Sequence, residues 1–123
     1  MKRDLDLIRE ILFVVEQQRV TDKAITLHKK QFVDKFPEIT DDMLDEHIRL
    51  LVEQNLLESE PHQLGWFILR LTWSGHDFLQ HSKMNSIWQK TKKVASDFSL
   101  DLVVSTLKDY AADYLKSVMI GNP

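Results

Sequence analysis

Apolar residues recur at three- and four-residue steps near the start of the chain, a spacing that places them on one face of a helix. Asp4 and Asp6 lie in the first turn of this predicted helix, where the helix dipole favours carboxylates. A second stripe of the same period begins after Thr40, a residue type preferred as a helix N-cap. We therefore expect two amphipathic helices, with buried stripes formed by Leu5, Ile8, Ile11, Leu12 and Val15, and by Leu44, Ile48, Leu51 and Val52.

The segment between these helices contains two shorter patterns. Its β-branched run AITL, residues 24–27, favours a short strand. The run KKQFVDKF, residues 29–36, predicts a brief helix that stops at Pro37, because proline disfavours helix in the residue before it.

After the second helix the pattern changes to two β-prone runs. Residues 56–60 and 66–71 predict an antiparallel hairpin, with Pro61–Gly65 as a turn outside the ladder. Three further helices follow, capped in our prediction by Thr72, Asn85 and Ser99. Gly75, in the first of these helices, allows a close approach of whatever packs against it.

The last predicted helix carries a heptad-like apolar seam that needs a cover, because a bare stripe of that length is an aggregation hazard. Two covers are open: the first helix of the same chain, or the same helix of a second copy. We favour a homodimer, with the seam Leu100, Val104, Leu107, Ala111, Tyr114 and Val118 as its interface.

The order of helix, short strand, two helices, hairpin and helix is that of a winged helix. The predicted fold class is mainly α with a small β-hairpin, a winged helix-turn-helix with a C-terminal helical extension. Residues 1–82 should form the winged-helix domain. We expect residues 83–123 to pack on it, so that the chain is a single structural unit.

Composition narrows the classes of protein to which the chain can belong. The chain has no cysteine, which excludes disulfides, a thiol nucleophile and thiolate metal ligands. The N-terminus lacks the apolar region of a signal peptide, and no apolar run approaches the ~20 residues that span a bilayer. We expect a cytoplasmic protein that does not contact a membrane.

The charge distribution changes the picture of the second helix, which occupies the position of a DNA-recognition helix. Residues 38–60 carry eight carboxylates against Arg49, whereas DNA binding relies on lysine and arginine at phosphates. We interpret this helix as a candidate protein-contact face rather than a major-groove reader. An ordinary solvated face, with Asp45, Arg49 and Glu53 as a charge ladder, is the alternative. The candidate residues are Asp41, Asp42, Asp45, Glu46, Arg49 and Glu53.

Nucleic acid, if it is bound, should meet the basic segments 23–35 and 83–93 instead. Scattered lysines on a solvated surface are the competing explanation. The candidate nucleic-acid contacts are Lys23, Lys29, Lys30, Lys35, Lys90, Lys92 and Lys93.

Enzymatic motifs are absent from the sequence. There is no HExxH, glycine-rich phosphate loop or GxSxG elbow, and the five histidines lack metal-ligand spacing, so we assign them to packing or chance. Asp42 and Glu46 share a helix face, but an acid/base pair needs burial. We predict no catalytic residue, metal or cofactor. The aromatic residues Trp66, Phe67, Trp73, Phe78 and Trp88 should be core, with Trp66 beside the turn as the exception.

Four stretches carry a more particular resemblance: MKRDLDLIREIL, HIRLLVEQNLL, LTWSGHDFL and SIWQK. Together they are similar to short bacterial and phage proteins grouped as domain-of-unknown-function family 2513. The resemblance implies a winged-helix fold and a bacterial or prophage setting, and it carries no catalytic residue or ligand. Three functions stay open: a non-enzymatic module that binds a protein partner, a DNA-binding transcriptional regulator, and, more weakly, an enzyme with an unrecognised pocket.

Overall fold

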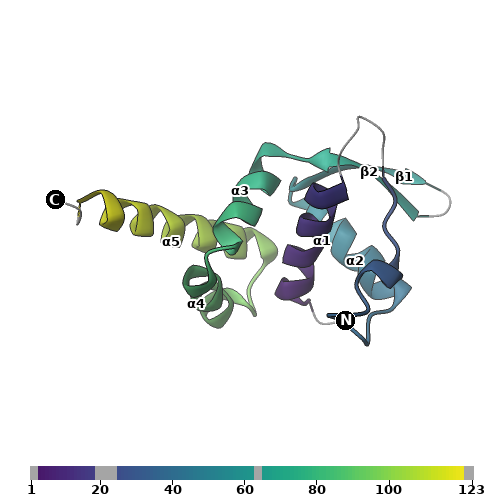
Figure 1. Cartoon of the computed structure of the whole chain (residues 1–123), viewed down its shortest axis with the longest axis horizontal. Helices are drawn as coiled ribbons and strands as arrows, with labels where there is room; N and C mark the ends of the chain where they lie inside the picture. Colours follow the sequence, from purple (N-terminus) through teal and green to yellow (C-terminus); the bar gives the residue numbers. More distant parts are fainter. Residues whose placement is uncertain (1–2, 19–24, 63–64, 121–123) are drawn as a thin grey trace. The chain divides into compact units, whose positions relative to one another are not determined.

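The computed structural model describes residues 3–18, 25–62 and 65–120, which are mainly α-helical with one small hairpin. This confirms the predicted fold class, and the elements follow the order of a winged helix with a helical extension. Their bounds are α1 (Leu5–Gln18), η1 (Lys29–Gln31), α2 (Asp41–Glu53), β1 (Leu57–His62), β2 (Gly65–Leu71), α3 (Trp73–Ser82), α4 (Asn85–Ala95) and α5 (Leu100–Ile120) (Figure 1).

The chain forms two compact units, Met1–His76 and Asp77–Pro123, which are described separately. The expected division at residue 82, with the extension packed as part of one structural unit, stays a prediction. In the first unit, α1 and α2 pack against each other and against the hairpin (Figure 1).

Helix α1 buries the whole predicted stripe, together with Leu7. Asp4 precedes the helix instead of lying in its first turn. Its carboxylate accepts the backbone N–H groups of Asp6 and Leu7 at 3.0 and 3.2 Å, which is how an N-cap satisfies the free donors of a helix start.

The connection between α1 and α2 has less regular structure than its sequence predicts. The short strand is reduced to a single antiparallel bridge between Ile25 and Ile68; Ala24 lies outside the described residues. The brief helix is one 3-10 turn, η1, followed by turns at residues 32–35 and 37–38. Phe32 is buried beneath this segment and anchors it to the unit.

Helix α2 begins at the predicted cap, where Thr40 Oγ1 accepts the N–H of Met43 at 3.1 Å. Leu44, Ile48 and Leu51 are buried as predicted, whereas Val52 is half-buried. The helix ends at a left-handed residue, Asn55, with φ of 58°. The next N–H, of Leu56, then reaches back to Leu51 O at 2.9 Å, which closes the helix end in the manner of a Schellman motif.

Strands β1 and β2 pair antiparallel, which confirms the predicted hairpin. The ladder is longer than predicted, since Pro61 pairs with Trp66 and His62 with Gly65, and a bulge interrupts it between Glu58 and Ser59. The expectation that Pro61–Gly65 lie outside the ladder is therefore wrong, although residues 63–64 lie outside the described part. A proline is tolerated in this strand because an edge strand has no second neighbour that requires its N–H.

The start of α3 is tied to the turn after α2. Thr72 Oγ1 donates to Asn55 O at 2.6 Å and accepts the N–H of Gly75 at 2.9 Å, so Thr72 is the predicted cap. A Cβ on Gly75 would lie 2.1 Å from Leu56 O, which explains why glycine is needed at this close approach.

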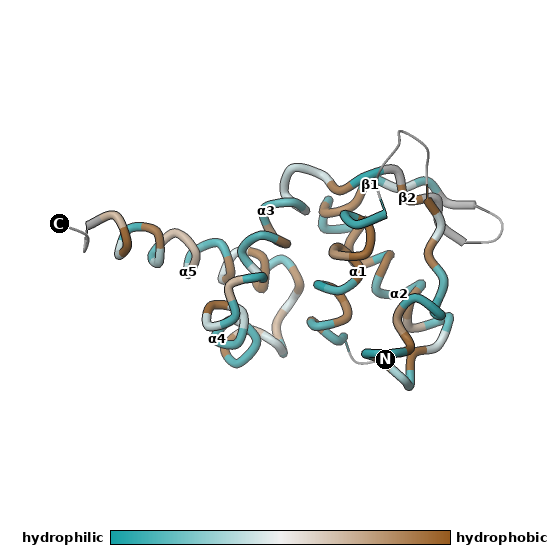
Figure 2. Tube along the Cα trace, in the orientation of Figure 1, coloured by the Kyte–Doolittle hydropathy of each residue, from teal (hydrophilic) through white to brown (hydrophobic). Residues whose placement is uncertain are grey.

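In the second unit α4 packs alongside α5. Ser99 caps α5 as predicted, accepting the N–H of Leu102 at 3.3 Å. Asn85 is not the cap of α4, because Met84 holds the N-cap position and Asn85 is the first helical residue. Figure 2 shows hydrophilic and hydrophobic residues alternating along α5 towards its C-terminal end.

The aromatic residues differ in burial. Phe78 and Trp88 are buried and pack edge to face, with ring centroids 5.8 Å apart at 81°. Trp73 is 80 % exposed at the start of α3, because Thr72 turns inward to cap the helix and the next residue points away. The expectation of a buried aromatic is therefore wrong for Trp73; the side chains of Trp66 and Phe67 lie outside the described part, so the exception expected at Trp66 stays a prediction. No helix among the described residues is long and apolar enough to cross a membrane.

Candidate functional site

The outer surface of α2 carries the residues predicted as a protein-contact face, which we call the acidic face. Because Leu44, Ile48 and Leu51 turn inward, the residues between them turn outward. Asp41, Asp42 and Glu46 are exposed, and the side chain of Asp45 retains 45 % of its exposure. The predicted exposure of these carboxylates is confirmed. The complete face is Asp41, Asp42, Asp45, Glu46, Arg49 and Glu53.

His47 fixes the rotation of α2 about its axis. The side chain is fully buried, its Nε2 accepts the N–H of Asp4 at 2.9 Å, and its Nδ1 lies 2.7 Å from Met43 O. These contacts require Nδ1 to carry the proton and donate to the carbonyl. Packing is thus the role of this histidine, as expected, but its hydrogen-bonded link to α1 was not foreseen. The signal for its burial was available in the sequence, because His47 lies three residues after Leu44 and four before Leu51 and so shares their face of the helix.

Little of the negative charge on the acidic face is neutralised. Arg49 forms an ion pair with Asp45 at 3.3 Å, but Glu53 does not join it, so the predicted three-residue ladder is wrong at that residue. Within residues 3–18, 25–62 and 65–120, Asp41, Asp42 and Glu46 form no ion pair. These three carboxylates stay available to a partner.

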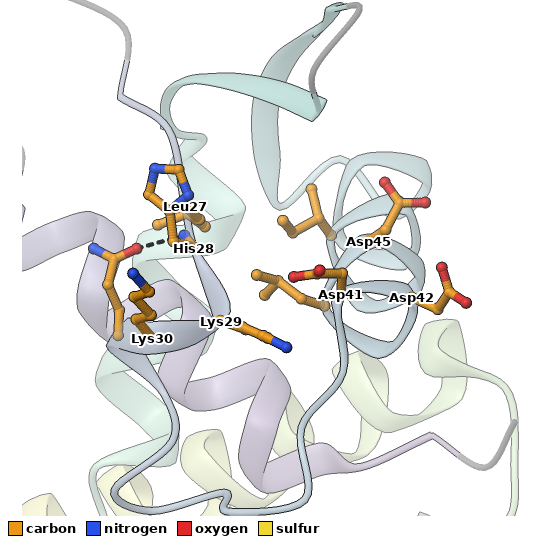
Figure 3. Close-up of a pocket in the computed structure, with 10 residues that line it drawn as sticks. Leu27, His28, Lys29, Lys30, Asp41, Asp42 and Asp45 are labelled. Carbon is orange, nitrogen blue, oxygen red and sulfur yellow. Dashed lines mark hydrogen bonds between the residues drawn. The ribbon is translucent and has the colours of Figure 1, made fainter.

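A groove of about 860 Å³ lies between α2 and the segment around η1, and we call it the charged groove. One wall carries three of the acids on α2, and the other carries Lys29 and Lys30. Figure 3 shows Lys29 reaching across towards α2 and the carboxylate of Asp41 pointing back towards the segment. Apolar side chains complete the lining, which comprises Leu27, His28, Lys29, Lys30, Gln31, Asp41, Asp42, Leu44, Asp45 and Ile48.

The charged groove joins two sets of residues that the sequence offers as alternatives. Lys29 and Lys30 belong to the candidate nucleic-acid contacts, while Asp41, Asp42 and Asp45 belong to the acidic face. Both lysines are exposed, and neither forms an ion pair within the described part of the chain. A polyanion that approaches the lysines therefore also meets carboxylates on the facing wall.

The other candidate nucleic-acid contacts are dispersed. Lys35 forms an ion pair with Glu10 at 3.3 Å and lies 6.0 Å from the ring centroid of Phe13, so its ammonium group already has partners within the chain. Lys90, Lys92 and Lys93 lie on α4 in the second unit. There Lys90 sits 4.3 Å from the Tyr110 ring and Lys92 sits 5.9 Å from the Trp88 ring. Lys23 lies outside the described residues.

The predicted dimer seam is divided by the structure. Leu100, Leu107 and Ala111 are buried and Val104 is half-buried, whereas Tyr114 and Val118 are each 46 % exposed. Val103, which the seam did not include, is fully buried. The cover over the first part is α4, which was neither of the two covers considered.

The candidate acid/base pair of the sequence lies on the surface of α2. Asp42 and Glu46 are both exposed, so the burial that would distinguish an acid from a base is missing. Among the described residues, no three histidine or carboxylate side chains are grouped so that they could hold a metal ion.

Comparison with known proteins places the chain among relatives without a described activity. A family model described as "Hypothetical protein (DUF2513)" matches residues 2–101. The chain belongs to this family. The family match covers the acidic face and the charged groove and ends at the start of α5.

A curated relative extends the similarity beyond the family match. It is an "Uncharacterized protein" of Haemophilus influenzae (strain ATCC 51907 / DSM 11121 / KW20 / Rd), and it is 27 % identical over 123 residues. The alignment covers 97 % of this chain and 99 % of the relative. No solved structure matches the chain.

Proposed function

We propose that this chain is a non-enzymatic winged-helix binding module of bacterial or phage type, which acts in the cytoplasm through a protein partner. The acidic face of α2 is its contact surface, and a basic surface of the partner is what it meets. The observation that carries the proposal is the exposure of Asp41, Asp42 and Glu46 without ion pairs in the described part of the chain.

The same charges argue against contact with DNA through α2. In a winged helix this helix enters the major groove and lies between two phosphate backbones. Carboxylates placed there face phosphates, and such like-charge contacts cost several kcal/mol. Lys29 and Lys30 do not offset this repulsion, because a phosphate bound to them faces Asp41 across the charged groove.

The construction of α2 suits a protein contact. The helix is held at its start by Thr40, at its middle by His47 and at its end by Asn55, so the carboxylates project from a rigid support. A preorganised surface loses little conformational entropy on binding. The charged groove beside it adds a concave surface with apolar lining, which a flat acidic helix lacks.

Affinity purification from the native host tests the proposal with two variants that lose four carboxylates each. One variant neutralises the acidic face (Asp41→Asn, Asp42→Asn, Asp45→Asn, Glu46→Gln). The matched control neutralises four exposed aspartates elsewhere: Asp34, Asp77, Asp97 and Asp109. We expect a basic protein to co-purify with the wild type and the control and to be lost from the first variant. The same proteins on all three baits would contradict the proposal.

A DNA-binding regulator is the second candidate, and α4 favours it. That helix has no carboxylate, and Lys90 and Lys93 are exposed on it. If α4 contacts phosphates, affinity for a labelled duplex should fall steeply as salt rises, and Lys90→Gln with Lys93→Gln should lower the slope of log affinity against log salt by about 2. No salt-dependent binding would remove this candidate.

A further inference from the structure

The two walls of the charged groove carry opposite charges that do not pair with each other. Lys29 and Lys30 lie on one wall and Asp41 lies on the other, and Figure 3 shows Lys29 and Asp41 pointing towards one another. No ion pair among the described residues joins the two walls. Because opposite charges attract across such a gap, the fold must hold the walls apart.

Backbone and core contacts fix both walls. Ile25, which precedes η1, exchanges two backbone hydrogen bonds with Ile68 of β2, at 2.9 and 2.8 Å. Phe32, directly after η1, is buried in the core. On the other wall, Thr40 caps α2 and Ile39 before it is buried. The gap is therefore a property of the fold, and its charges are available to a ligand that enters it.

This arrangement selects a ligand that carries both signs of charge. A ligand of one sign is attracted to one wall and repelled by the other, whereas a ligand with a positive side and a negative side is attracted to both. The lining also includes the apolar side chains of Leu27, Leu44 and Ile48. Arginine and lysine bury their aliphatic stems on such a surface while their charged ends stay in water.

The number of charges favours a protein segment over a small zwitterion. Each wall carries more than one charge, since Asp42 and Asp45 line the groove beside Asp41, and Lys30 lines it beside Lys29. A single amino acid cannot match them all. Successive side chains of an extended chain point to opposite sides, so a chain that alternates basic and acidic residues presents one sign to each wall.

We propose that the charged groove binds an extended segment of the protein partner in which basic and acidic residues alternate. Its basic side chains lie towards α2 and its acidic side chains towards Lys29 and Lys30. The groove volume of about 860 Å³ falls in the range of roughly 300–1,000 Å³ that is usual for ligand clefts. This inference rests on the proposed function, because it takes the partner to contact α2, and it adds the kind of segment that is bound.

Nuclear magnetic resonance titration of the ¹⁵N-labelled full chain tests the proposal with two capped peptides of equal length and composition. One alternates arginine and glutamate, and the other carries all its arginines before its glutamates. The alternating peptide should bind about tenfold more tightly, which corresponds to two or three exposed ion pairs. It should shift the amide signals of residues that line the groove. Equal affinities, or shifts confined to other residues, would overturn the proposal.

The basic wall is tested by Lys29→Gln with Lys30→Gln. This variant should bind the alternating peptide about tenfold more weakly and should bind a purely basic peptide of arginine and glutamine more tightly, because the repelling wall is gone. Loss of structure cannot produce these opposite changes. The matched control is Lys108→Gln with Lys116→Gln, two exposed lysines of α5, which should leave both affinities unchanged. An alternating peptide that is insensitive to the groove lysines would overturn the proposal.

The acidic wall is tested by Asp41→Asn with Asp42→Asn, which should weaken both the alternating and the purely basic peptide. Asp97→Asn with Asp109→Asn removes two exposed carboxylates of the second unit and should weaken neither. An alternating peptide that binds both variants as it binds the wild type would overturn the proposal.

The peptides and the affinity purification described above separate two failures. If the acidic-face variant loses a basic protein while the two peptides of equal composition bind equally, the inference about the groove is overturned and the proposed function stands. If all three baits retain the same proteins, the proposed function is overturned, and the inference that rests on it falls as well.

Discussion

Helices α2 and α5 are built on the same pattern, yet they leave different surfaces to solvent. Each buries an apolar stripe at three- and four-residue steps. The stripe of α2 is covered along the helix and its outer side is charged, whereas the stripe of α5 is covered only as far as Ala111. The comparison teaches that periodicity identifies the residues that share a face, while the length of the neighbouring element decides how much of that face is buried.

The largest expected effect is a difference in the free energy of unfolding between variants of two leucines on these stripes. Leu51→Ala in α2 should lower the free energy of unfolding by about 3 kcal/mol, because a fully buried leucine leaves a cavity. Leu115→Ala in the exposed C-terminal part of α5 should cost less than about 0.5 kcal/mol, because this leucine is 51 % exposed. Urea unfolding at low protein concentration measures both, and equal losses would remove the distinction between the covered stripe and the bare one.

The next largest loss of stability is expected from replacing the buried histidine of α2. His47→Leu should cost about 2 kcal/mol, because the N–H of Asp4 loses its acceptor at a part-buried site. The exposed His28 provides the control, and His28→Leu should stay within about 0.5 kcal/mol. Hydrogen exchange at the amide of Asp4 should also accelerate in the His47 variant; an unchanged rate would show that another group protects it.

Removing the N-cap hydroxyl should have a smaller effect on stability. The effect should be similar in α2 and α5, because each helix begins with a hydroxyl cap. Thr40 accepts from Met43 N at 3.1 Å, and Ser99 accepts from Leu102 N at 3.3 Å. Thr40→Ala and Ser99→Ala should each cost about 1 kcal/mol. Thermal unfolding followed by circular dichroism checks both. A negligible loss in Ser99→Ala alone would indicate that α5 is held by its packing against α4.

The smallest effect on stability is expected from the acidic face. Replacing Asp41, Asp42 and Glu46 with their amides should change the free energy of unfolding by no more than about 0.5 kcal/mol per residue, because the side chains are exposed. Asp45→Asn should cost a similar amount through the lost ion pair with Arg49. A cooperative loss in urea unfolding of the fourfold variant would mean that these carboxylates support the fold rather than contact a partner.

The elements that follow local rules were predictable from the sequence. The stripes of α1 and α2, the caps Thr40, Thr72 and Ser99, and the need for glycine at residue 75 depend on neighbouring residues and on side-chain chemistry. The family was predictable from motifs spread along the chain.

Features that join distant segments were not predictable. The hydrogen bond from Asp4 to His47 spans 43 residues, and no local pattern pairs them. The charged groove exists because the fold brings Lys29 opposite Asp41, although the sequence shows them only as separate basic and acidic segments. The exposure of Trp73 depends on which neighbour turns inward, and in this case Thr72 does.

Site-specific photo-crosslinking in the native host tests the role of the acidic face most directly. A photoreactive residue at Glu46 reports on the acidic face, and one at Lys93 reports on the candidate nucleic-acid surface; both positions are exposed. Our account predicts an adduct at residue 46 that protease removes and nuclease does not, with no comparable adduct at residue 93. A nuclease-sensitive adduct at residue 46 would contradict it.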